Sequence, residues 1–215
     1  MTQPILYDYW RSSACYRVRI ALNLKGVAYE AAPVNLLADE QMADAYKDAN
    51  PQGLVPALAI GGRVLTQSLA IVEWLDATHA EPKLIPADPD DRAHVMAMAL
   101  AIACDIHPLN NLRVLKHLAR LGIDQGARDD WYRHWIAEGF AGLEALAAPR
   151  AGRFLFGDAP SLADICLVPQ MYNARRLETP LDAYPTLLRA DAAATALDAF
   201  AAAHPDRVAP AAAKG

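Results

Sequence analysis

Short apolar runs and one stretch of helical spacing alternate along the first 34 residues. The run Ile5–Tyr7 predicts a strand, and the apolar positions that follow it, from Val18 to Leu22, have the spacing of a helix. We expect this helix to begin near Tyr16 and to end at Gly26, the residue type that best adopts a left-handed cap. Residues 27–34 predict a second strand. A strand–helix–strand unit of this size normally has two parallel strands.

The next segment predicts a helix, a hairpin and another helix. Residues 39–49 favour a short polar helix, which Asn50-Pro51 stops. Two apolar runs, 54–60 and 63–66, flank Gly61-Gly62, and this is a strong hairpin signal. Gln67-Ser68 opens the next helix, with Ser68 as its expected N-cap. The order β-α-β-α-β-β-α matches the thioredoxin-like layout.

The second half of the chain shows helical spacing and no strand signal. Prolines cluster between Glu81 and Pro89, which is typical of a linker. We therefore expect a thioredoxin-like domain over 1–81, a linker over 82–89 and an all-helical domain over 90–215. The expected helical segments are 91–121, 129–148, 161–174 and a stretch after Pro185.

Three prolines mark irregularities in this helical half. Pro108 and Pro169 lie inside helical patterns, and each is expected to kink or break its helix. From Pro205 onward the chain is rich in alanine and proline, so we expect it to be frayed.

Composition excludes several classes of function. The net charge is −5 with no compensating basic cluster, so nucleic acid is not an expected partner. The three cysteines are widely spaced and lack companion histidines, so neither a disulfide framework nor a metal site is indicated. No run has the length of a membrane span, and no signal-peptide pattern is seen at the N-terminus. We expect a cytoplasmic protein that does not bind membranes.

Three features of the first domain favour one kind of ligand. Ser12 and Ser13 precede a helix, where a hydroxyl and the helix dipole can stabilise a thiolate, although such residues often only cap the helix. A cis bond at Val55-Pro56 would free the Val55 backbone for an extended peptide, although a trans proline is commoner. The helix start at Gln67-Ser68 could bind a carboxylate or could be simple capping. Together they describe a groove for a small acidic thiol peptide.

The chain resembles the zeta-class glutathione transferases, and within them the maleylacetoacetate isomerase family. The resemblance extends in order over nearly the whole chain and is carried by Arg11–Leu22, Asn50-Pro51, Val55-Pro56, Gln67–Ile71, Leu109–Leu115, Ser161–Gln170 and Tyr184-Pro185. It implies a glutathione transferase fold and a homodimer. It also implies a glutathione-dependent cis–trans isomerisation of maleylacetoacetate to fumarylacetoacetate, by thiolate addition, rotation and elimination.

The resemblance also implies roles for individual residues. Ser12 would stabilise the glutathione thiolate, with Ser13 and Cys15 beside it as further catalytic candidates. The implied glutathione-binding residues are Ser12, Ser13, Gln41, Val55, Gln67, Ser68, His107, Asn111 and Arg113. Arg11 with Arg175 or Arg176 would bind the substrate carboxylates. The family's cysteine after the second serine is replaced by Ala14, and Cys15 follows one position later.

Other residues have simpler interpretations, and other functions stay open. Asp164 fits a helix cap, Trp131 and Trp135 fit helix packing, and Cys104 and Cys166 fit buried inert thiols. His107 is either a ligand contact or a residue of the helix break. The open alternatives are maleylpyruvate isomerisation, transfer of glutathione to small halogenated acids, thiol redox chemistry or glutathionylation at Cys15, and a non-enzymatic interaction module.

Overall fold

The computed structural model describes residues 3–210 and divides the chain into two compact units. One unit contains the residues through Lys83 together with those from Ala196 onward, and the other is Leu84–Thr195. This division differs from the expected helical domain of residues 90–215, because the last segment belongs to the first unit. The physical reason is a pair of hydrogen bonds within that unit: Arg19 Nε donates to the carbonyl of Ala203 at 3.1 Å, and Asn23 Nδ2 donates to that of Ala199 at 2.9 Å.

A four-stranded sheet forms the centre of the first unit. Its strands are β1 (Ile5–Asp8), β2 (Glu30–Pro33), β3 (Ala57–Ile60) and β4 (Arg63–Thr66), in the order β2-β1-β3-β4. β1 and β2 are parallel, whereas β3 is antiparallel to both β1 and β4. Gly61 and Gly62 connect β3 to β4 with φ of 57° and 76°, values that suit glycine in a tight hairpin turn. The thioredoxin-like fold class is confirmed.

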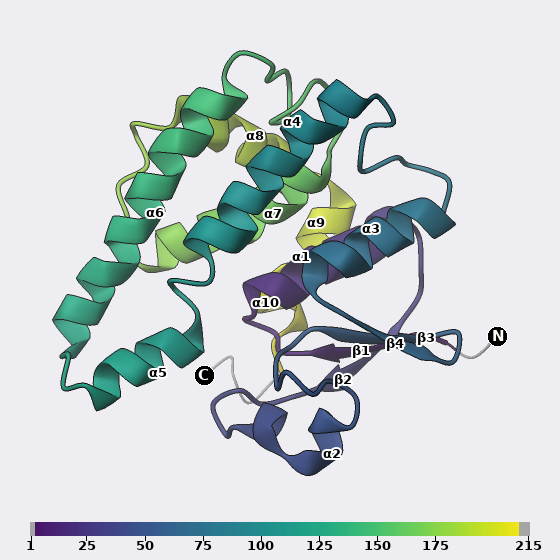
Figure 1. The fold of residues 1–215 in the computed structure, drawn as a ribbon. Coiled ribbons are helices and arrows are strands. Elements are labelled where there is room, and N and C mark those ends of the chain that lie inside the picture. The colour runs from purple at the N-terminus through teal and green to yellow at the C-terminus, as the bar shows by residue number, and fades with distance from the viewer. Residues whose placement is uncertain (1–2, 211–215) are drawn as a thin grey trace. The chain divides into compact units, whose positions relative to one another are not determined.

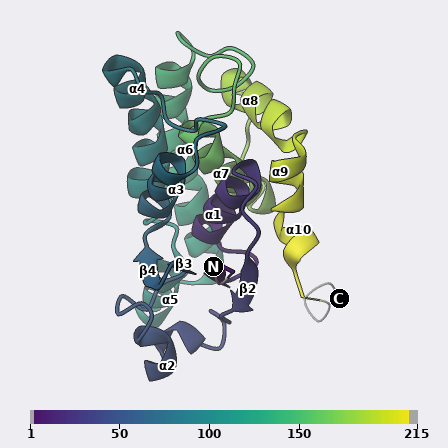
Figure 2. The same ribbon diagram turned by 90° about the vertical axis from the view of Figure 1, so that its right-hand side faces the viewer.

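Two helices lie side by side on one face of this sheet, α1 (Ser13–Leu24) and α3 (Ser68–Thr78) (Figures 1 and 2). The α1 helix begins three residues before the expected start at Tyr16, because the Ser12 side chain caps it. The expected helix of residues 39–49 is instead a 3₁₀ turn, η1 (Glu40–Met42), followed by α2 (Asp44–Lys47). Extended backbone at Ala43 separates the two.

Buried cations join α1 to the rest of the first unit. The Arg19 guanidinium binds Asp8 of β1 at 2.6 Å and the carbonyl of Trp10 at 2.9 Å, in addition to Ala203. These partners come from β1, from the turn after it and from the C-terminal segment α9 (Asp198–Ala202) and α10 (Pro205–Val208). The expected fraying from Pro205 onward is therefore wrong for 205–208, which are helical, and the part of it that concerns residues 211–215 lies outside the described residues.

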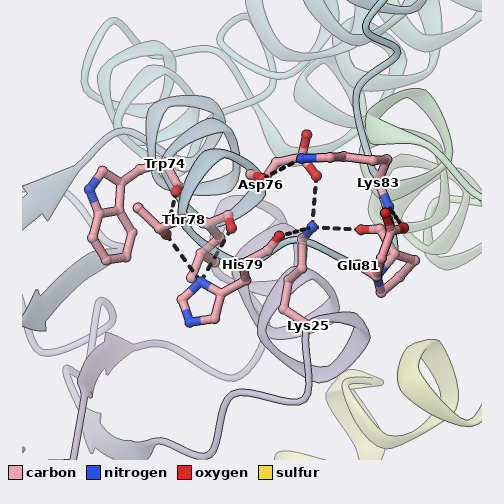
Figure 3. Close-up of polar contacts among 9 residues, drawn as sticks. Lys25, Trp74, Asp76, Thr78, His79, Glu81 and Lys83 are labelled. Carbon is pink, nitrogen blue, oxygen red and sulfur yellow. Dashed lines mark hydrogen bonds and ion pairs between the residues drawn. The ribbon is translucent and has the colours of Figure 1, made fainter.

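Lys25 at the end of α1 is the second such cation (Figure 3). Its ammonium, which is completely buried, binds Asp76 Oδ1 at 2.8 Å, the carbonyl of His79 at 2.8 Å and that of Pro82 at 2.6 Å. An ammonium group has three donors, so all three are used here. Lys25 therefore fixes the path of the chain from the end of α3 through residues 79–82.

The named elements of the second unit are all helices. They are α4 (Pro89–Leu100), the π-helix η2 (Ala101–Ile106), α5 (Leu112–Arg120), α6 (Gln125–Ala147), α7 (Leu162–Arg176) and α8 (Pro185–Thr195). The helical pattern breaks at Pro108 as expected, whereas α7 continues through Pro169. None of the described helices has both the length and the apolar character needed to cross a membrane.

Asp164 has the expected capping role in this unit. Its side chain accepts hydrogen bonds from Ser161 N and Ser161 Oγ, and Ser161 in turn caps α7. The other carboxylate oxygen accepts from Leu155 N at 2.9 Å, so the cap also holds the segment before α7. Burial raises the pKa of Asp164 to about 6, and the hydrogen bonds it accepts lower that value in part.

Candidate functional site

The sheet register brings three candidate segments to one end of the first unit. Tyr7 near the end of β1 pairs with Ala57 at the start of β3, and Ala57 also pairs with Thr66 at the end of β4. The turn after β1, the segment before β3 and the start of α3 therefore meet at the same end of the sheet. These are the segments that contain Ser12, Val55-Pro56 and Gln67-Ser68.

Ser12 is placed at the N-terminus of α1 and caps it. Its Oγ accepts a hydrogen bond from Cys15 N at 3.3 Å, and its own N–H donates to the carbonyl of Tyr9 at 2.8 Å. A hydroxyl that accepts in this way keeps its hydrogen as a donor. The side chain can therefore cap the helix and at the same time donate to an anion, next to the positive end of the helix dipole.

The Val55-Pro56 bond is cis in the structure. Val55 precedes the ladder between β1 and β3, which begins at Ala57. The carbonyl of Leu54, one residue earlier, accepts from Tyr46 Oη and from Asn50 Nδ2, both at 2.6 Å. These two hydrogen bonds hold the segment in place, so that Val55 lies just before β3 at the end of the sheet.

Gln67, rather than Ser68, is the N-cap of α3. Gln67 has φ of 67°, which is unusual for a residue with a side chain, and its Nε2 donates to Gln52 Oε1 at 2.8 Å. Backbone in this region costs about 1–3 kcal/mol and is concentrated at ligand sites. Ser68 is the first residue of the helix, and the expected N-cap at Ser68 is corrected accordingly. Its buried hydroxyl instead accepts from Arg17 Nη1 at 3.3 Å.

Gln41 lies beside the same segment. A Cβ at Gly53 would be 3.1 Å from the Gln41 carbonyl oxygen, so η1 packs closely on the loop that precedes Val55. Gln41 Nε2 donates to Asp39 Oδ1 at 3.1 Å. Its Oε1 is buried and has no hydrogen-bond partner among the described residues. An acceptor of this kind suits a ligand that brings an N–H group.

The cysteines differ from their expected environments. Cys15 is completely buried, and burial raises the pKa of its thiol far above the ordinary value. A buried neutral thiol is inert, so the geometry argues against redox chemistry or glutathionylation at Cys15. Cys166 is buried as expected, but Cys104 is exposed, because Ile102 and Ile106, and not Cys104, are the residues that η2 buries.

The remaining glutathione candidates lie in the second unit, just after η2. His107 follows the π-helix, and Asn111 caps α5 by accepting from Arg113 N at 3.1 Å. Trp131 supports this segment, since its Nε1 donates to the carbonyl of Leu109 at 2.9 Å. It also packs edge-on against Trp135, which confirms the expected packing role of the pair.

The two arginines at the end of α7 have different partners. Arg175 forms an ion pair with Asp191 on α8, whose carboxylate is buried. The guanidinium of Arg176 lies 5.8 Å from the ring centroid of Tyr132. Arg11 in the first unit stacks in a similar way, 5.3 Å from the Trp10 ring. Because aromatic stacking leaves the guanidinium edge available, Arg11 and Arg176 are better suited than Arg175 to bind a further anion.

Arg17 is a residue that reasoning from the sequence missed. It is only 2% exposed and contacts Ser68, a candidate ligand residue from another helix. In the sequence it looks like one more charge near the first turn. The structure places it within the buried stretch from Cys15 to Leu22, and residue identity gave no signal of this burial. No cluster of metal-ligating side chains is found in the described part of the chain.

A thioredoxin-like sheet with a capping serine at α1, a cis-proline before β3 and a helical second unit defines a glutathione transferase. Residues 6–83 match the family described as Glutathione S-transferase, N-terminal domain. A maleylacetoacetate isomerase of Rhizobium meliloti is 51% identical over 97% of this chain and 99% of the relative. A maleylpyruvate isomerase of Ralstonia sp is 50% identical over 93% of this chain and 96% of the relative.

Solved structures agree with these sequence relatives. A holo maleylpyruvate isomerase, described as a zeta-class bacterial glutathione transferase, has a TM-score of 0.93 and 49% identity, over 95% of this chain and 98% of that one. A maleylacetoacetate isomerase of Anaeromyxobacter dehalogenans 2CP-1 with bound glutathione has a TM-score of 0.88 and 48% identity, over 97% and 98%. This chain belongs to the zeta-class glutathione transferases, in the family of maleylacetoacetate and maleylpyruvate isomerases.

Proposed function

We propose that the chain catalyses the glutathione-dependent cis–trans isomerisation of maleylacetoacetate to fumarylacetoacetate. The observation that carries the proposal is the Ser12 hydroxyl, which caps α1 and keeps its hydrogen for an anion at the helix N-terminus. The residues present fit glutathione: the Gln41 oxygen has no partner among the described residues, and Val55 precedes the sheet ladder at an ordered cis-proline.

Glutathione, when bound, supplies the thiolate that adds to the cis double bond, allows rotation about the resulting single bond and then leaves. Ser12 donates to the sulfur and keeps it ionised, with help from the N-terminal N–H groups of α1. Val55 binds the cysteinyl backbone, and Gln67 with Ser68 binds the γ-glutamyl end. The other proposed contacts with glutathione are Ser13, Gln41, His107, Asn111 and Arg113.

The substrate is a diacid, so the chain must anchor carboxylates. We assign this task to Arg11 and Arg176, because both guanidinium groups are stacked on aromatic rings while Arg175 is paired with Asp191. Carboxylates anchored in this way fix the ends of the substrate while its central bond rotates. The charge that develops when sulfur adds is stabilised by the same cations.

A second candidate substrate is maleylpyruvate. The observation in its favour is that a maleylpyruvate isomerase and a maleylacetoacetate isomerase resemble this chain almost equally in sequence. The chemistry is identical on a shorter diacid. The first substrate belongs to tyrosine degradation and the second to a gentisate-type pathway, both of which break down aromatic rings.

The deciding experiment compares the two substrates by absorbance, each with and without glutathione. Turnover of maleylacetoacetate with the higher kcat/KM, and only with glutathione, is the expected result. A higher kcat/KM for maleylpyruvate would select the second candidate. Equal turnover without glutathione, or none with either substrate, would contradict the proposed function.

Three further expectations belong to this proposal. The first unit would bind glutathione and the helical unit would hold most of the substrate. The protein would be a cytoplasmic homodimer, as the family resemblance implies. Light scattering coupled to gel filtration tests the dimer, since a dimer has twice the mass of the 23.3 kDa chain.

A further inference from the structure

Arg17 differs from the other buried cations of the first unit. Its Nη1 donates to Ser68 Oγ at 3.3 Å, but its Nε and Nη2 are buried and have no hydrogen-bond partner among the described residues. Arg19, two positions along α1, binds one carboxylate and two carbonyls, and Lys25 does the same. Helix α1 and its C-cap residue Lys25 therefore hold two buried cations with all donor nitrogens used and one, Arg17, with unused donor nitrogens.

A buried charge without a partner is costly to the folded chain. Guanidinium cannot lose its proton at ordinary pH, so Arg17 cannot avoid the cost by becoming neutral. No acidic side chain of the described residues forms an ion pair with it. A bound anion from outside the chain would supply the missing partner of the buried guanidinium and so explain this arrangement.

The contact with Ser68 shows where that anion would lie. A guanidinium nitrogen only donates, so Ser68 Oγ acts as the acceptor and its own hydrogen is directed elsewhere. Ser68 is the first residue of α3, an eleven-residue helix whose first backbone N–H groups have no partner inside the helix. The hydroxyl, these N–H groups and the positive charge of Arg17 are therefore concentrated at one helix start.

We infer that Arg17 is a positioning residue that orients Ser68 and supplies the positive charge for the carboxylate at the γ-glutamyl end of glutathione. The inference rests on the proposed use of glutathione. It gives Arg17 a function in cofactor affinity and selectivity that is separate from the thiolate chemistry of Ser12. Arg17 contacts neither the sulfur nor the substrate in this scheme.

The test compares two ligands by calorimetry: glutathione, and 4-aminobutyryl-cysteinyl-glycine, which keeps the amine but lacks that one carboxylate. Wild-type protein is expected to bind glutathione about 10- to 100-fold more tightly than the analogue. Arg17→Met is expected to lose most of this preference, and Arg17→Lys to keep part of it. Ser12→Ala, the matched control, is expected to keep the preference while the pKa of the bound thiol rises.

Stability measurements separate this role from a purely structural one. Because the Arg17 charge has no ion-pair partner among the described residues, Arg17→Met is expected to melt no lower than the wild type without ligand. With glutathione its Tm is expected to rise less than that of the wild type. If Arg17→Met does not fold, Ser68→Ala replaces it and is expected to lose the same preference.

Two results would overturn the inference. One is an unchanged preference for glutathione over the analogue in Arg17→Met or, where that fails to fold, in Ser68→Ala. The other is a lower Tm of the free Arg17→Met protein with an unchanged ligand-induced rise, which a structural role predicts. A wild-type protein that binds neither ligand would instead contradict the proposed function, so the two failures are distinguishable.

Discussion

At the residue scale, the division of labour between Ser12 and Cys15 is open to direct test. Ser12→Ala removes the hydroxyl that donates to the thiolate but leaves the dipole of α1 in place. We expect kcat to fall about 100-fold, since removing a single hydrogen-bond donor to a developing anion lowers kcat by about this factor. The Kd of glutathione is expected to change little, and the pKa of its bound thiol, followed by ultraviolet absorbance, is expected to rise.

Cys15→Ala is the matched comparison in the same turn. Cys15 is completely buried and its pKa is raised by that burial, so its sulfur is not available to a ligand. We expect turnover close to that of the wild type together with a small loss of stability from the cavity. Loss of activity in Cys15→Ala with activity retained in Ser12→Ala would show that the assignment is reversed.

Residue identities alone could not reveal these environments. Ser12 was predicted as a site residue because a hydroxyl directly before a helix is a capping group, and the apolar spacing of the sequence shows where that helix begins. The burial of Cys15 depends on the sheet and the C-terminal segment packing around α1, and neither is visible in the turn itself. The same holds for Arg17, whose contact with Ser68 joins positions 51 residues apart.

At the scale of elements, Lys25 is expected to be the single side chain that contributes most to the stability of the first unit (Figure 3). Lys25→Met would leave the Asp76 carboxylate buried without its ammonium partner and would free two carbonyls. We expect a loss of about 3–5 kcal/mol in the free energy of unfolding, measured with urea. Lys83→Met is the control. Lys83 is exposed, and among the described residues its Nζ donates to the carbonyl of Asp76, at 3.4 Å, so a loss of about 0.5 kcal/mol or less is expected. Equal losses of unfolding free energy in the two variants would contradict this role of Lys25.

The π-helix η2 depends on a single glycine of α6. A Cβ at Gly139 would lie 2.2 Å from Cγ1 of Ile106, the last residue of η2, so the close approach of the two helices at this point requires glycine. Gly139→Ala is expected to displace Ile106 and, with it, His107. We expect a loss of about 1–3 kcal/mol and a higher KM for glutathione.

Gly142→Ala on the same helix is the control for this prediction. Gly142 has nothing within 4 Å of an added Cβ, and alanine favours helix more than glycine, so stability should rise by about 0.5–1 kcal/mol with KM unchanged. An unchanged KM in Gly139→Ala would show that η2 does not position His107.

The elements were predicted correctly where they depend on residues close together in the sequence, and incorrectly where they depend on distant residues or on an unusual backbone conformation. The hairpin at Gly61-Gly62 and the break at Pro108 follow from residue types with strong backbone preferences. The π-helix before Pro108 could not be predicted, because its last residue, Ile106, packs against Gly139, which lies more than thirty residues away in the chain. The N-cap at Gln67 was missed because its positive φ opposes the preference of its residue type.

At the scale of the whole molecule, the order of segments along the chain does not determine the units. Residues from Ala196 onward follow the helical unit in sequence but belong to the first unit, through Ala199 and Ala203. Both contacts are backbone carbonyls accepting from polar side chains of α1. Carbonyls are present at every residue, so no pattern in an alanine-rich segment could have indicated them.

Asp164 is expected to give the whole molecule a distinctive dependence on pH. Burial raises its pKa to about 6 in the folded chain, whereas its ordinary value is 3.8. Between these values the folded state binds more protons than the unfolded state, so this carboxyl group lowers the free energy of unfolding as pH rises through the window.

Asp164→Asn has no carboxyl group at this position and cannot titrate in that pH window. We expect the stability of the wild type relative to Asp164→Asn to increase by about 2 kcal/mol from about pH 7.5 to about pH 4.5, measured by urea unfolding at both values. A decrease over the same range would show that the hydrogen bonds from Leu155 and Ser161 outweigh burial and hold the pKa of this group below its ordinary value.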